Sequence, residues 1–85
     1  MDIFVGNIKP MGNYVLVAAS GLVKDGEIII KARGSAISRA VDLAEILKRQ
    51  HNPKYDITIG TVEMDDKKTS RKVNVSTIEI KMIKQ

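Results

Sequence analysis

The chain has 85 residues, a formal net charge of +4 and no cysteine. Its length allows one domain with a modest core, and the lack of cysteine excludes disulfides and thiolate metal sites. No apolar run is long enough to cross a membrane, and the first residues lack the basic and apolar regions of a signal peptide. We therefore expect a cytoplasmic protein with a single domain over residues 1–85 and with neither a metal nor a cofactor.

The first half of the chain predicts two strand–helix units, because apolar side chains follow first a strand pattern and then a helical spacing. The four elements are a strand over residues 2–6, a helix over 11–24, a strand over 27–32 and a helix over 36–50. Three consecutive isoleucines, Ile28 to Ile30, indicate that the second strand is central and buried on both faces. Asn52 and Pro53 end the second helix.

The second half of the chain predicts a long hairpin. Residues 55–64 and 73–82 are rich in β-branched side chains, and residues 65–72 between them are wholly polar. The apolar positions change parity at Gly60 and again near Ser76, which predicts a β-bulge at each point. The order β-α-β-α-β-β predicts an α/β protein of the α+β two-layer sandwich type. It would have a four-stranded mixed sheet, both helices on one face and an extended hairpin.

A very short turn joins the central strand to the second helix. Gly34 can take a positive φ, and Ser35 is the expected N-cap of the helix. The free N–H groups at a helix start carry partial positive charge, and Lys31 and Arg33 lie close by in the sequence. The turn is therefore a candidate site for an anion such as phosphate, although a turn of this kind often has no ligand.

Positive charge is concentrated towards the C-terminus. Residues 1–66 contain eight Lys or Arg and nine Asp or Glu, whereas residues 67–85 contain six and one. The basic residues at the expected hairpin tip are Lys67, Lys68, Arg71 and Lys72. A basic hairpin can follow a nucleic-acid groove and contact phosphates; a merely solvated tip is the alternative. Phe4, Tyr14 and Tyr55 are too few for a base-stacking platform, which favours backbone contacts to a duplex.

No catalytic arrangement stands out in the sequence. His51 is the only histidine, and neither a P-loop nor a Gly-x-Gly-x-x-Gly motif occurs. Asp65 and Asp66 precede two lysines, so charge balance at an exposed tip explains them better than a metal site. We predict a non-catalytic protein. The alternative from another class is a small enzyme that holds a substrate phosphate at the turn from Arg33 to Ser35.

Three stretches together resemble the Alba family of small archaeal chromatin proteins. They are Lys9-Pro10 with residues 13–16, residues 28–42 and residues 75–80, in the order and spacing of that family. The resemblance implies a chromosome-associated homodimer that binds double-stranded DNA along its backbone and minor groove with little sequence specificity. An RNA-binding role, as an RNA chaperone or ribonucleoprotein subunit, is the alternative.

The resemblance and the charge pattern also suggest the site residues. The predicted nucleic-acid contacts are Lys9, Lys31, Arg33, Ser35, Arg39, Lys67, Lys68, Arg71 and Lys72. The second helix has a broader apolar face than one sheet needs, so we expect Leu43, Leu47 and His51 to contact a second copy or a second dimer. Many family members have a further lysine before Lys9, an arginine in place of Ser35 and an aromatic residue in place of His51. We therefore expect weaker binding, a smaller salt slope and less cooperative coating of DNA.

Overall fold

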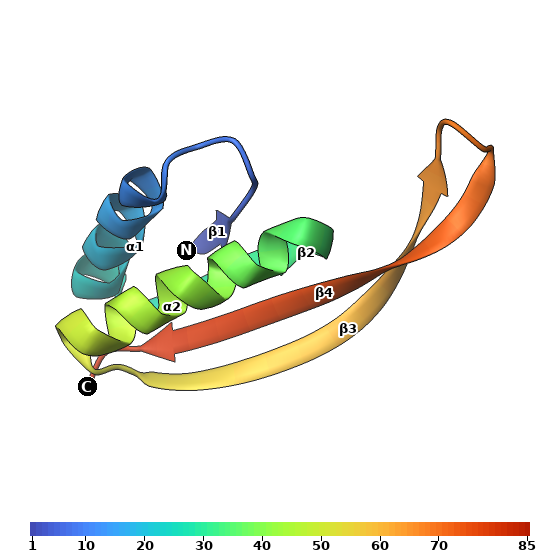
Figure 1. Ribbon diagram of the computed structural model, residues 1–85. Coiled ribbons are helices and arrows are strands. Elements are labelled where there is room, and N and C mark those ends of the chain that lie inside the picture. Colours follow the sequence, from blue (N-terminus) through green and yellow to red (C-terminus); the bar gives the residue numbers. More distant parts are fainter.

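The computed structural model describes residues 1–85 and contains the helices and strands in the predicted order (Figure 1). They are β1 (Asp2–Phe4), α1 (Met11–Asp25), β2 (Glu27–Arg33), a 3₁₀ turn (Gly34–Ala36), α2 (Ile37–His51), β3 (Lys54–Asp66) and β4 (Arg71–Ile83). One four-stranded sheet has the order β1-β2-β4-β3, with β1 parallel to β2 and the other pairs antiparallel. The predicted mixed sheet with two helices is confirmed.

Both helices pack against one face of this sheet, and the core lies between the two layers (Figure 1). Alternate residues of β2 and β4 point towards the helices, because successive side chains of a strand point to opposite faces. The largest fully buried side chains are Leu22, Ile28, Ile30, Leu43, Leu47, Ile80 and Met82. Burying one such side chain stabilises the fold by about 1.5–3 kcal/mol, so this single apolar layer holds the small chain together.

The central strand β2 is covered on one face only. Ile28 and Ile30 are fully buried, whereas Ile29 between them is only half-buried. Phe4 on the neighbouring strand β1 is 71% exposed. The prediction that β2 is buried on both faces is therefore wrong for the single chain. The uncovered face is tolerated because cross-strand ion pairs, such as Lys81 with Glu27 at 3.2 Å, occupy it.

The turn between β2 and α2 differs from the prediction at Ser35. Gly34 has a positive φ of 58°, as predicted, and a 3₁₀ turn precedes the helix. Ser35 makes no capping hydrogen bond; instead its Oγ accepts a hydrogen bond from Nδ2 of Asn7 at 2.8 Å. The predicted N-cap is therefore wrong, because the 3₁₀ turn moves the start of α2 to Ile37.

Strands β3 and β4 extend beyond the helices as a twisted two-stranded ribbon (Figure 1). We call residues 61–76 of this ribbon the arm. The pairing runs without interruption from Lys54 opposite Ile83 to Asp66 opposite Arg71, so both predicted β-bulges are wrong. The parity of the apolar residues changes for another reason: the arm lies outside the helix layer, and its apolar side chains occupy the other face of the ribbon.

Candidate nucleic-acid interface

Arg39 fixes the loop between β1 and α1 against α2. Its two terminal nitrogens donate hydrogen bonds to the carbonyl oxygens of Gly6 and Lys9. Its guanidinium carbon lies 5.7 Å from the centroid of the Tyr14 ring, and the Tyr14 hydroxyl accepts a hydrogen bond from the Gly6 N–H at 3.0 Å. The conformation of the loop that carries Lys9 therefore depends on two side chains that belong to the helices.

The loop before α1 and the turn before α2 form one continuous surface, since the Asn7–Ser35 hydrogen bond joins them. Lys9 and Arg33 are both exposed, and neither forms an ion pair. A basic side chain without a carboxylate partner is free to make a charge-assisted hydrogen bond to a phosphate oxygen. The structure thus places the predicted contacts Lys9 and Ser35 on neighbouring segments, whereas Arg33 ends β2 and lies, by strand alternation, on the sheet face away from the helices.

Lys31 lies on the sheet face away from the helices, where two carboxylates neutralise it. Its Nζ is 3.2 Å from Oδ2 of Asp2 and 3.2 Å from Oε1 of Glu79. The hydrogen bond to Glu79 and then that to Asp2 raise the pKa of Lys31. Two neighbouring negative charges cancel the attraction of one positive charge for a phosphate. A contact at Lys31 therefore stays a prediction, and one that this geometry disfavours.

The tip of the arm carries the other predicted contacts. Lys67 and Lys68 lie in the turn, Arg71 and Lys72 begin β4, and all four are exposed. Lys72 Nζ lies 3.3 Å from Oε1 of Glu63, whereas the other three cations have no carboxylate partner. An exposed pair of this kind contributes about 0–1 kcal/mol, but it still lowers the local positive charge. The available cations at the tip are therefore Lys67, Lys68 and Arg71.

Leu43 and Leu47 lie on the face of α2 that packs against the sheet. Both side chains are 0% exposed, so neither can contact a second copy, and that prediction is wrong. Residues four apart share one face of a helix, and here that face is the one that closes the core. His51 is exposed at the end of α2, and its predicted contact stays a prediction.

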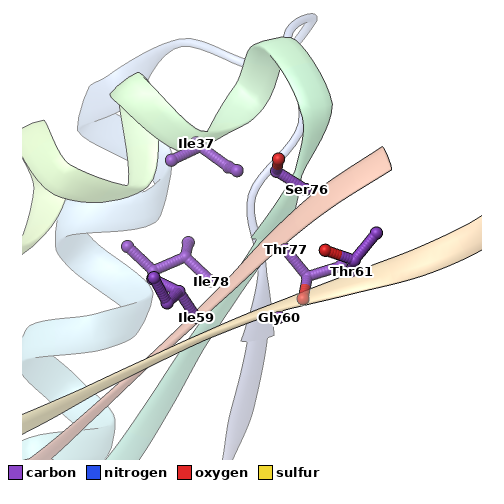
Figure 2. Close-up of a pocket in the computed structure, with 7 residues that line it drawn as sticks. All are labelled: Ile37, Ile59, Gly60, Thr61, Ser76, Thr77 and Ile78. Carbon is purple, nitrogen blue, oxygen red and sulfur yellow. The ribbon is translucent and has the colours of Figure 1, made fainter. Parts of the chain in front are cut away.

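An exposed apolar surface lies beside α2 on the outer strand β3. Tyr55, Ile57 and Ile59 are 46%, 55% and 78% exposed, although they point to the same side of the sheet as the helices. Together with Ile37 and Val41 of α2, we call them the shelf. Figure 2 shows the residues around a hollow at one end of the shelf, among them Ile37 of α2 and Ile59 and Ile78 of the sheet. Alternation in the sequence indicated an apolar face on β3, but the strand order decides that α2 leaves it uncovered.

No group of three or more His, Cys, Asp or Glu side chains is placed to hold a metal ion. No helix is long and apolar enough to cross a membrane. The fold and this surface define a small two-layer α+β protein that presents a protruding ribbon with a basic tip.

The model of the family described as Alba matches residues 1–62. The chain is 40% identical to the DNA/RNA-binding protein Alba of Nanoarchaeum equitans, across 99% of this chain and 98% of that protein. It is 45% identical to the DNA/RNA-binding protein Alba 1 of Archaeoglobus fulgidus, across 99% and 96%. The solved structure of Alba from Thermoplasma volcanium covers 99% of this chain and 100% of its own, with a TM-score of 0.87 and 40% identity.

The chain therefore belongs to the Alba family, and the resemblance inferred from the sequence is confirmed. The relatives are named as nucleic-acid-binding proteins and not as enzymes, which agrees with the prediction of a non-catalytic protein.

Proposed function

We propose that this chain binds double-stranded DNA as a homodimer, through phosphates along the backbone and minor groove, with little sequence specificity. It would act as one domain over residues 1–85 and organise chromosomal DNA in the cytoplasm. The observation that carries the proposal is the group of three unpaired cations at the arm tip, Lys67, Lys68 and Arg71. The names of the relatives support nucleic acid as the partner.

Among the predicted contacts, the cations without a carboxylate partner or main-chain hydrogen bond lie at two separate places, the body and the arm tip, in a molecule 45 Å long. The body contributes Lys9 and Arg33, and the tip contributes three more. These five cations per chain predict about ten phosphate contacts in a dimer and a salt slope of about −9. Contacts spread along the backbone in this way provide affinity without reading the bases.

We infer that a second copy of the chain covers the shelf. The five shelf residues form an apolar surface next to the core, and a chain of this size buries only a modest core of its own, so covering the shelf would add to its stability. Because the shelf is bounded by α2 and by the edge strand β3, a second copy placed there would also fill the hollow in Figure 2. This assignment replaces the contact predicted at Leu43 and Leu47.

The RNA-binding alternative rests on the names of the relatives, which include RNA as well as DNA. Phosphate contacts serve both nucleic acids, so the same cations fit either partner. The alternative of a phosphate-binding enzyme has less support, because the relatives are named as nucleic-acid-binding proteins.

Fluorescence anisotropy with duplex DNA and structured RNA, titrated with salt, tests the proposal. We expect steep salt-dependent binding of DNA, with a slope that falls by about 0.9 per lost contact, or about 1.8 per dimer, in Arg33→Ala. Lys31→Ala is the matched control and should leave the slope unchanged, because two carboxylates already neutralise Lys31. Tighter binding to RNA than to DNA would mean that RNA is the main partner. No binding to either nucleic acid at low salt would refute the proposal.

A further inference from the structure

The arm has two unlike faces, because its strands pair in strict register. On the face that points away from the helix side, Val62 pairs with Val75 and Met64 pairs with Val73. Val62 and Val73 are 39% and 40% exposed, and the other two are half-buried. These four side chains form a continuous strip outside the core, which we call the apolar face of the arm.

The opposite face of the arm is polar and acidic. Glu63 lies across from Asn74, and Asp65 lies across from Lys72. The only cation on this face, Lys72, already pairs with Glu63 at 3.3 Å. Two carboxylates and one paired lysine give the face a net negative charge, which repels phosphate. When the arm lies on a nucleic acid, this acidic face therefore turns towards solvent.

Arg71 extends the apolar face towards the tip. It lies two residues before Val73 on the same side of β4, directly across from Asp66. Asp66 accepts two hydrogen bonds within the turn. Its Oδ1 accepts one from the Lys68 N–H at 2.9 Å, and its carbonyl oxygen accepts one from the Ser70 N–H at 2.8 Å. Arg71 forms no ion pair, so the apolar strip ends in an available guanidinium group.

We propose that the apolar face lies along the minor groove of duplex DNA and selects DNA over RNA. This inference deepens the proposed function and rests on it. A minor groove about 6 Å wide is too narrow for a two-stranded ribbon to enter. The arm therefore lies over the groove, with Val62 and Val73 on the deoxyribose edges and Arg71 reaching into the negative potential between them.

The selection arises at the 2′ position of the sugar. Deoxyribose presents only C–H groups there, whereas RNA presents a hydroxyl in its minor groove. A hydroxyl placed against Val62, Val73 or Met64 loses its water and gains no hydrogen-bond partner, because none of these side chains carries a polar acceptor of useful strength. The arm thus binds a deoxyribose backbone more tightly than a ribose backbone and contacts no base specifically.

Charge complementarity favours DNA over a second copy as the occupant of this face. The strip ends beside Lys67, Lys68 and Arg71, a group of cations that would repel the same group on another arm. The shelf, which lies beside the core and carries the 78% exposed Ile59, is the better surface for a second copy.

The test combines Val62→Thr with Val73→Thr and compares the double variant with Asn74→Thr on the acidic face. Threonine is nearly isosteric with valine and keeps its preference for strands, but it offers a partner to a 2′-hydroxyl. Anisotropy is measured for DNA and RNA duplexes of equivalent sequence over a range of salt. We expect wild type to prefer DNA by about fivefold or more, the cost of one unsatisfied hydroxyl. The double variant should lose this preference with its salt slope unchanged, and Asn74→Thr should keep it.

The other outcomes contradict either the role of the apolar face or the proposed function. A double variant that discriminates as wild type does, or a wild type that prefers the RNA duplex, refutes the inference and leaves duplex binding intact. A change of oligomeric state in the double variant, seen by light scattering, means that a second copy covers the face. The absence of salt-dependent binding to either duplex refutes the proposed function itself. Val73→Thr alone, checked by circular dichroism, serves if the double variant does not fold.

Discussion

The guanidinium group of Arg39 lies over the ring of Tyr14, with 5.7 Å between its central carbon and the ring centroid. The same group donates hydrogen bonds to the carbonyl oxygens of Gly6 and Lys9. One arginine therefore connects α2, α1 and the loop after β1. The sequence suggested Arg39 as a phosphate contact, a role that stays a prediction, whereas the structure shows two of its donor nitrogens directed at main-chain oxygens.

Arg39→Lys keeps the positive charge but loses the planar fork that bridges the two carbonyls. We expect a loss of about 1–2 kcal/mol of stability in urea denaturation and faster hydrogen exchange at the Gly6 amide. Arg49→Lys, an exposed position on the same helix, is the matched control. If Arg39 acts only as a phosphate contact, Arg39→Lys will be as stable as the control variant.

The ion pairs of Lys31 predict a stability difference at alkaline pH. The hydrogen bond to Glu79, followed by that to Asp2, raises the pKa of Lys31 above its ordinary value of 10.5. The folded chain then holds this proton more tightly than the unfolded chain does. The resulting stabilisation is complete below the unfolded-state pKa and disappears as the pH rises through the folded-state pKa.

We therefore expect the stability advantage of wild type over Lys31→Gln to be constant at lower pH and to shrink as the pH rises past 10.5. Thermal denaturation of both proteins across this range measures the difference, and Lys67→Gln controls for the loss of a lysine without a partner. An advantage that does not change with pH would show that the pairs do not persist in solution.

The shelf predicts which substitution prevents dimerisation. Ile59 is 78% exposed on the shelf, and Leu16 is 73% exposed on α1. We expect Ile59→Glu to give a folded monomer, because a buried carboxylate without a partner is costly at an interface. Leu16→Glu should leave the dimer intact. Size-exclusion chromatography with light scattering distinguishes them, and an equal effect of the two substitutions would locate the interface elsewhere.

We predict that Leu47 stabilises the fold by packing in the core. Since its side chain is 0% exposed, Leu47→Ala should lower the free energy of unfolding by about 2–5 kcal/mol through lost burial and the cavity left behind. His51→Ala at the exposed helix end should change it by less than about 0.5 kcal/mol. Urea denaturation at one protein concentration measures both. If Leu47→Ala dissociates the dimer without a loss of stability, Leu47 lies in the dimer interface, as the sequence predicted.

Local patterns in the sequence were enough to predict the helices, the strands and their order. Helical spacing located α1 and α2 to within about two residues, and the positive φ of Gly34 followed from the short turn. The basic tip was also visible, because Lys67 to Lys72 are adjacent in the chain and no distant residue is needed to bring them together. The predicted β-bulges were wrong, because a change of apolar parity can reflect a change in which face is covered.

What the sequence by itself determined is therefore the set of elements, their order and the charge at the end of the hairpin, all of which depend on neighbours in the chain. Only the tertiary structure decided that Leu47 faces the core while Ile59 stays exposed, because the strand order places β3 at the edge of the sheet, where α2 covers it only in part. It likewise decided that Lys31 is neutralised by Asp2 and Glu79, which come from two other strands. Burial and ion pairing depend on residues far apart in sequence, so their outcome is set when the layers pack.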